Sequence, residues 1–272
     1  MLRIARMIGL AAVVSASTGI ATAQTDHDHA HAEPADKTVA TSELPGGWDV
    51  LDRAVEAGGG VDAYMKIKNF VAKGGFSMPA MGVEGSIERT QSAPGNLFMH
   101  IDLGPMGEVI QATDGETVWG LQPGMTEPVI MKGEQAEEMI ANARFYDRVH
   151  PRDEYESAEV VGVEDVDGTS CYRVNLEDKT GKNAVSFYSV ESGHQIRTMS
   201  RSNPEAEAFD VIIELSDFRE VDGLVHAFVM KQTIQGNEFT ITFDSFEHDV
   251  TIDDSIFAPP AEETPEIPEG EI

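Results

Sequence analysis

The densest group of potential metal ligands lies near the amino end of the sequence, in the run Asp26-His27-Asp28-His29-Ala30-His31. Imidazole nitrogens bind Zn²⁺ and Cu²⁺, and alternating histidines on a flexible segment can supply two or three of them to one ion. The predicted metal ligands are therefore His27, His29 and His31. Such binding would be loose because nothing nearby fixes the geometry, and a polar spacer is the favoured alternative.

The sequence lacks the motifs that assemble common catalytic centres. It contains no Gly-x-Ser-x-Gly, His-Glu-x-x-His or Gly-x-x-x-x-Gly-Lys pattern, and Cys171 is its one cysteine. The 48 acidic residues show no spacing that selects a catalytic pair. The histidines of the central region are scattered singly, at His100, His150, His194, His226 and His248. No catalytic residue and no cofactor is predicted, and the chain is not expected to be an enzyme.

Apolar side chains, many of them methionine, recur at alternate positions of several segments. Methionine adapts its shape to varied partners, so methionine-rich faces suit a cavity for flexible acyl chains, although they equally suit an ordinary core. The residues predicted to line such a cavity or its lid are Phe76, Met78, Met99, Ile101, Trp119, Met139, Ala143 and Tyr146.

A sheet must position these side chains. Apolar residues alternate with polar ones in segments that include 70–78, 97–103, 172–176, 209–215 and 239–243, and turn signals such as Asp-Gly pairs separate the segments. About ten or eleven strands in series are expected. The predicted fold class is mainly β (α+β): a curved antiparallel sheet forming an incomplete β-barrel with a few covering helices. Phe76 and Met78 should lie inside, while Lys73 and Ser77 should face water.

Two segments have helical rather than strand periodicity. A short helix is expected from Gly47 to Ala57, where the three glycines at 58–60 stop it. A second helix is expected from Glu134 to Val149, with Met139, Ala143 and Tyr146 on its apolar face. This second helix could plug a barrel mouth or simply cover the sheet, and the simple cover is favoured.

The ends of the chain differ in composition from the centre. Residues 1–23 have two arginines, a short apolar run and a final Ala-Thr-Ala, the pattern of a cleaved signal peptide. Residues 24–44 are expected to form a disordered His-bearing leader, residues 45–258 one β domain, and residues 259–272 a disordered acidic, proline-rich tail. The lone Cys171 lies far from the cleavage site, so a soluble periplasmic protein is expected rather than a lipoprotein.

The charge balance restricts the partners. The sequence carries 48 acidic and 19 basic residues, a formal net charge of −29. Such a surface repels phosphate backbones and anionic headgroups, which argues against nucleic acid and against electrostatic membrane docking. Stable membrane insertion is not expected either, because the apolar run near the amino end is too short for a spanning helix. Solubility alone is a sufficient explanation of this charge. A monomer is expected.

Several stretches together resemble proteins of the outer-membrane lipoprotein-sorting (LolA/LolB-like) fold and their uncharacterised periplasmic relatives. They are Ala57-Gly58-Gly59-Gly60-Val61-Asp62-Ala63, Asp114-Gly115-Glu116-Thr117-Val118-Trp119-Gly120 with Pro123-Gly124, the segment from Val161 to Val174, and the closing Ile252-Asp253-Asp254-Ser255-Ile256-Phe257-Ala258-Pro259. The likeness spans roughly residues 50–260 and rests on structural rather than catalytic motifs.

This resemblance implies a helix-closed, incomplete barrel with an apolar cavity that accepts acyl chains. The resulting hypothesis is a periplasmic binding or carrier protein for a lipid-like or hydrophobic ligand, in envelope lipid or lipoprotein handling. The alternative is a non-catalytic interaction module of a cell-envelope complex. The expected partners are therefore a lipid or other amphiphile, or an envelope protein.

Overall fold

The computed structural model of the 272-residue chain describes residues 44–201, 209 and 211–260. The predicted signal peptide, the predicted leader except Leu44, and the tail beyond residue 260 lie outside these residues. The three histidines predicted as metal ligands, His27, His29 and His31, lie outside them as well. These predictions therefore remain predictions.

The described part of the chain is mainly β. Its helices are α1 (Gly47–Ala57), α2 (Gly60–Tyr64), α3 (Glu134–Ala143) and α4 (Pro151–Glu154). Short 3-10 turns are η3 (Pro79–Met81), η4 (Gly104–Met106), η5 (Tyr146–Val149) and η6 (Asp254–Ile256). The strands are β1 (Asn69–Met78), β2 (Val83–Ser92), β3 (Asn96–Asp102), β4 (Glu108–Thr113), β5 (Val118–Leu121), β6 (Val129–Met131), β7 (Tyr155–Val166), β8 (Thr169–Asp178), β9 (Asn183–Ser189), β10 (Gln195–Ser200), β11 (Val211–Val221), β12 (Leu224–Ile234) and β13 (Asn237–His248).

The strands follow one another in a sheet of order β6-β5-β4-β3-β2-β1-β13-β12-β11-β10-β9-β8-β7. Neighbours pair antiparallel wherever the register is defined, for example β7 with β8 and β3 with β4. The sheet is not closed, because β6 and β7 each have one neighbour. The mainly β fold class with an unclosed antiparallel sheet and few helices is thus confirmed, with thirteen strands in place of the ten or eleven expected.

The residues form two compact units that interleave along the chain. Of the described residues, the first unit comprises those up to Lys66, Ser77–Gly82 and those between Tyr146 and Thr242. The second unit comprises Ile67–Phe76, Val83–Phe145 and the described residues from Phe243 to 260. The predicted boundaries of a single β domain, 45–258, stay a prediction.

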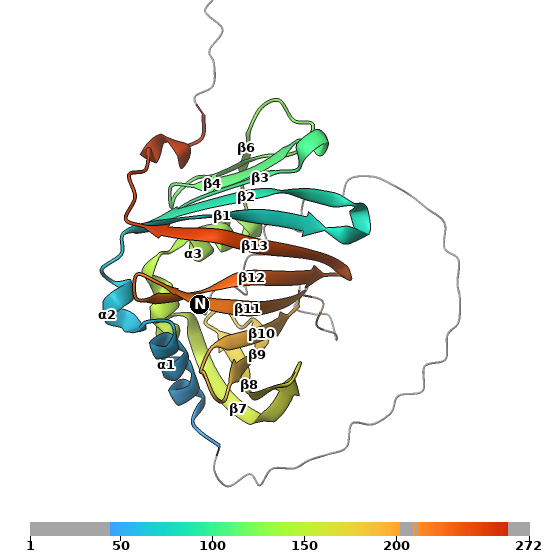
Figure 1. Cartoon of the computed structure of the whole chain (residues 1–272). Helices are drawn as coiled ribbons and strands as arrows, with labels where there is room; N and C mark the ends of the chain where they lie inside the picture. Colours follow the sequence, from blue (N-terminus) through green and yellow to red (C-terminus); the bar gives the residue numbers. More distant parts are fainter. Residues whose placement is uncertain (1–43, 202–208, 210, 261–272) are drawn as a thin grey trace, which may run out of the picture. The chain divides into compact units, whose positions relative to one another are not determined.

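In the first unit, α1 packs on the strands β7 to β9 (Figure 1). Its apolar stripe repeats at helical spacing, so the buried residues meet the sheet as a single face. The shared cluster consists of Val50, Leu51, Ala54, Tyr155, Val174, Leu176 and Tyr188. A second cluster includes alternate strand residues, among them Val185 and Phe187, with Cys171.

In the second unit, α3 packs on the sheet through Ala136, Met139 and Ala143, which contact Leu97 and Val118. The buried amide of Gln91 on β2 fixes the end of this helix, because its Nε2 donates to the carbonyl oxygen of Ala143 at 2.9 Å. Carbonyls in the last turn of a helix have no partner within the helix, so this bond satisfies an otherwise unpaired group.

The helix expected over Glu134–Val149 is shorter than predicted, since α3 ends at Ala143. Arg144 has extended backbone angles, and the next backbone N–H, of Phe145, donates to the carbonyl of Pro94 at 2.9 Å. This bond turns the chain away from the helix axis. Tyr146–Val149 then form the separate turn η5, which belongs to the first unit.

The edge strand β7 has a distinct surface. It is 12 residues long, pairs only with β8, and its register shifts between Tyr155 and Ser157 and again between Val160 and Gly162. Its exposed acidic side chains are Glu156, Glu159, Glu164 and Asp165.

Replacing Gln91 by Ala should lower the free energy of unfolding by about 1–3 kcal/mol, because the α3 carbonyls would lose their buried donor. Gln135, exposed on the same helix, provides the control: Gln135→Ala should leave the urea midpoint nearly unchanged. Equal midpoints for the two variants would contradict the assigned role of Gln91.

Candidate functional site

A close backbone contact joins the end of α1 to the turn between β11 and β12. The backbone N–H of Val225 donates to the carbonyl of Gly58 at 3.1 Å. Gly59 has a φ of 111°, and a Cβ there would lie 2.4 Å from the carbonyl oxygen of Gly223. Only glycine tolerates both the backbone angle and the contact. The glycine run predicted to stop α1 therefore also brings the helix against this turn.

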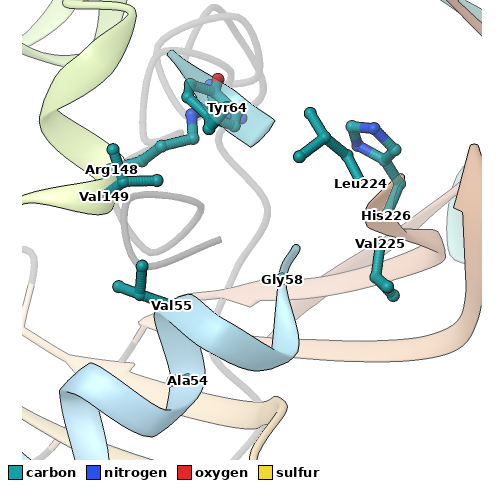
Figure 2. A pocket seen from close by; sticks show the side chains of 9 residues that line it. All are labelled: Ala54, Val55, Gly58, Tyr64, Arg148, Val149, Leu224, Val225 and His226. Carbon is teal, nitrogen blue, oxygen red and sulfur yellow. The ribbon is translucent and has the colours of Figure 1, made fainter. Parts of the chain in front are cut away.

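Beside this contact lies a cavity of about 30 Å³, which we call the inner cavity (Figure 2). Its walls come from α1, α2, η5 and the start of β12. The apolar wall residues are Ala54, Val55, Val149, Leu224 and Val225, joined by Gly58. A space of this size holds about two water molecules at most.

Three polar side chains complete the inner cavity: Tyr64, Arg148 and His226. Tyr64 and His226 are buried. The guanidinium carbon of Arg148 lies 5.1 Å from the centre of the Tyr64 ring, a cation–π contact that Figure 2 shows as the Arg148 side chain reaching toward Tyr64. Tyr146 meets the same ring edge-on, with centroids 6.4 Å apart.

A larger depression, about 280 Å³, lies between α1, α2 and the η5–α4 segment, and we call it the outer groove. Its apolar residues are Val55, Val61, Val149 and Pro151, and its polar ones are Asp52, Glu56, His150, Arg152 and Asp153. Val55 and Val149 line both spaces. These two valines therefore separate the outer groove from the inner cavity.

Arg152 holds α4 to α1 across the outer groove. Its guanidinium donates two hydrogen bonds to the carboxylate of Asp52, at 2.5 and 2.8 Å, and lies 5.1 Å from the centre of the Trp48 ring. The hydrogen bond from Arg152 lowers the pKa of Asp52. Both side chains are about half exposed, so the pair positions the helices more than it stabilises the fold.

The groove and the cavity offer apolar side chains together with charged and hydrogen-bonding ones. Within residues 44–201, 209 and 211–260, no three His, Cys, Asp or Glu side chains gather as metal ligands would. Burial raises the pKa of the Cys171 thiol to about 11, so this thiol stays protonated at neutral pH. The inner cavity has mainly apolar walls with three polar side chains, as small-molecule sites commonly do, whereas the outer groove has four apolar and five polar or charged lining residues.

Four of the predicted cavity-lining residues lie on one face of the second unit. Met139 and Ala143 are buried against Leu97, and Met99 and Ile101 follow Leu97 at alternate positions of β3. Phe76 is buried in the same unit. The burial of Met139 and Ala143 is that of an ordinary covering helix.

The other three predicted residues lie elsewhere. Trp119 is on the opposite face from Met99, because Trp119 pairs with Ala112, whereas Met99 pairs with the adjacent Gln111. There its indole N–H donates to the carbonyl of Phe257 at 2.9 Å. Met78 and Tyr146 belong to the first unit, Met78 in β1 and Tyr146 beside the inner cavity. On β1, Lys73 is exposed and Ser77 half-buried.

Sequence reasoning missed the site formed by the outer groove and the inner cavity. Its walls come from segments near residues 55, 149 and 225, which no local periodicity connects. The available signals were the glycine run at 58–60 and His150-Pro151, both of which indicate chain turns without indicating that the turns meet.

Comparison with known proteins identifies the fold. No protein-family model and no curated protein matches the sequence. Among solved structures, a DUF1329 family protein from Desulfovibrio piger has a TM-score of 0.57 at 16% identity, covering 79% of this chain and 98% of that one. A LolA superfamily protein from Nitrosomonas europaea has a TM-score of 0.53 at 13% identity, with 79% and 98% covered. The chain has a LolA-like fold.

A third structure agrees with this LolA-like fold. A domain from Vibrio parahaemolyticus, assigned to outer membrane lipoprotein sorting, has a TM-score of 0.53 at 9% identity and covers 78% of this chain and 95% of its own. The predicted resemblance is therefore confirmed at the level of the fold. Among the described residues of this LolA-like chain, no helix is both long and apolar enough to cross a membrane.

Replacing Gly59 by Ala should lower the free energy of unfolding by about 2 kcal/mol or more, because the new Cβ meets both an unfavourable φ and the Gly223 carbonyl. The matched control is Gly162→Ala on β7, where a Cβ would meet nothing within 4 Å. Urea denaturation of both variants measures the difference. A Gly59→Ala protein as stable as the control would show that the helix end does not need this contact.

Proposed function

We propose that this protein is a periplasmic binding or carrier protein for a lipid-like or hydrophobic ligand, and that it binds this ligand where α1, α2 and η5 meet. The observation that carries the proposal is the pair Val55 and Val149, which alone line both the outer groove and the inner cavity. The LolA-like fold supports it, since one of the similar structures is assigned to outer membrane lipoprotein sorting.

The sizes of the two spaces determine how binding would work. The outer groove, about 280 Å³, is near the lower end of ligand-site volumes, whereas the inner cavity of about 30 Å³ cannot take an acyl chain. An apolar tail would therefore enter by separating Val55 from Val149. Each methylene group that it buries contributes about 0.8 kcal/mol, which can offset the displaced valine contacts.

The apolar face under α3 remains a second proposed location, with Met99, Ile101, Met139 and Ala143 as its lining. Met139 and Ala143 are packed against the sheet, and Gln91 holds the helix end in place. Binding there requires α3 to leave the sheet, which breaks the apolar contacts of Met139 and Ala143 and the buried hydrogen bond from Gln91. The outer groove needs a smaller rearrangement and is therefore the preferred location.

Residues 1–23 support a periplasmic location, because their composition is that of a cleaved signal peptide. The proposed partners are accordingly a lipid or other amphiphile of the cell envelope. The alternative function, a non-catalytic interaction module, would place an envelope protein segment on the same surface.

A charge on the groove floor should weaken amphiphile binding. Val61→Asp, at a half-buried position of α2, should reduce the affinity for the uncharged fluorophore N-phenyl-1-naphthylamine by about tenfold or more, because the new carboxylate must lose water when the ligand docks. Val161→Asp, at a position 43% exposed on β7, is the control and should bind as the wild type does. A wild type that binds no amphiphile would refute the carrier function and favour the interaction module.

The same fluorophore distinguishes the two locations. Met139→Asp should lower the free energy of unfolding by about 3 kcal/mol or more, comparable to Ile213→Asp in the core, while the folded fraction keeps its affinity for the fluorophore. Urea midpoints and fluorescence titrations give both quantities. An unchanged midpoint with lost binding would move the proposed site from the outer groove to the face under α3.

A further inference from the structure

The charged groups at the outer groove are mainly acidic. Asp52, Glu56 and Asp153 face it with Arg152 as the one arginine or lysine among its lining residues. With His150 neutral, the lining carries a net charge of −2, the difference between three carboxylates and one guanidinium. A ligand head placed there meets a negative potential.

The hydrogen bonds from both terminal nitrogens of Arg152 go to Asp52, so these nitrogens do not pair with Glu56 or Asp153. Glu56 and Asp153 are exposed and form no ion pair with any of the described residues. The Glu56 carboxylate lies beside α2, since a Cβ at Gly60 would be 3.2 Å from its Oε2 atom. Two unpaired carboxylates thus line a depression that also has apolar walls.

Apolar and charged groups are ordered from the inside outward. Val55 and Val149, which line the groove, are buried, whereas Glu56 and Asp153, which also line it, are exposed. An amphiphile whose tail points toward the two valines would place its head beside these carboxylates. An anionic head would be repelled there, whereas an ammonium group is attracted to both carboxylates and can donate a hydrogen bond to either.

On the basis of the proposed function, we propose that the ligand is an amphiphile with an ammonium head. Glu56 and Asp153 bind this head at the outer groove, and the tail lies against Val55, Val61 and Val149. The head selects the ligand class, and the tail supplies most of the affinity. The groove is therefore expected to bind lipids with an ammonium head more tightly than uncharged or anionic lipids.

Three ligands with the same twelve-carbon chain test the preference: dodecylammonium, monododecanoylglycerol and dodecanoate. Each is titrated below its critical micelle concentration against the full-length mature protein carrying N-phenyl-1-naphthylamine, and displacement gives the affinity. The wild type should bind dodecylammonium more tightly than the other two. In the double variant Glu56→Gln/Asp153→Asn, the ratio of the affinity for dodecylammonium to the affinities for the other two ligands should fall about fivefold, because two exposed ion pairs with the ammonium group are lost.

A second double variant controls for the overall negative charge of the protein. Glu177→Gln/Glu220→Gln removes two exposed carboxylates away from the groove, and it should retain the wild-type preference. An equal loss in both double variants would overturn the inference, because net charge alone would then explain the preference. Equal affinity of the wild type for all three ligands would overturn it too, while leaving the proposed function intact. If the wild type binds neither the fluorophore nor any of the three ligands, the proposed function itself is refuted.

Discussion

The candidate site depends on a backbone contact that side chains would prevent. The end of α1 reaches the β11–β12 turn because Gly59 has no Cβ to meet the Gly223 carbonyl, and the Val225 N–H then bonds to Gly58. This contact sets the distance between Val55 on the helix and Leu224 on the strand, and so the width of the inner cavity. The apolar stripe of α1, packed on β7 to β9, fixes the other end of the helix. The site is therefore held by packing at one end and by a hydrogen bond at the other.

Local sequence patterns predict most of the helices and strands, but not which of them contact one another. The sequence predicts α1 with its bounds, because an amphipathic stripe followed by three glycines determines both the helix and its end. Alternation likewise predicts the strands and the burial of Phe76. It does not predict that Trp119 lies opposite Met99, because the face of a short strand depends on the register with its neighbour. The end of α3 at Ala143 also depends on residues distant in sequence. The Gln91 side chain donates to the carbonyl of Ala143, and the carbonyl of Pro94 accepts from the N–H of Phe145.

The two spaces of the site differ in the sign of their charged groups. Arg148 brings a positive charge to the lining of the inner cavity and lies over the ring of Tyr64. The outer groove carries an excess of carboxylates. Val55 and Val149 therefore line both a cavity with one guanidinium in its lining and a groove with three carboxylates and one guanidinium in its lining. The large acidic excess of the sequence agrees with the negative net charge of the outer groove, but it does not predict the arginine at the inner cavity.

The edge strand β7 bears on how copies of this protein behave together. An unclosed sheet leaves backbone N–H and C=O groups that could pair with another sheet. On β7 the two register shifts interrupt the regular spacing that such pairing needs, and the exposed carboxylates of Glu156, Glu159 and Asp165 give the edge a negative charge that a second copy would share. Edge-to-edge polymerisation is thereby opposed both by geometry and by repulsion. An unclosed sheet of this kind can thus remain unpaired at high local concentration.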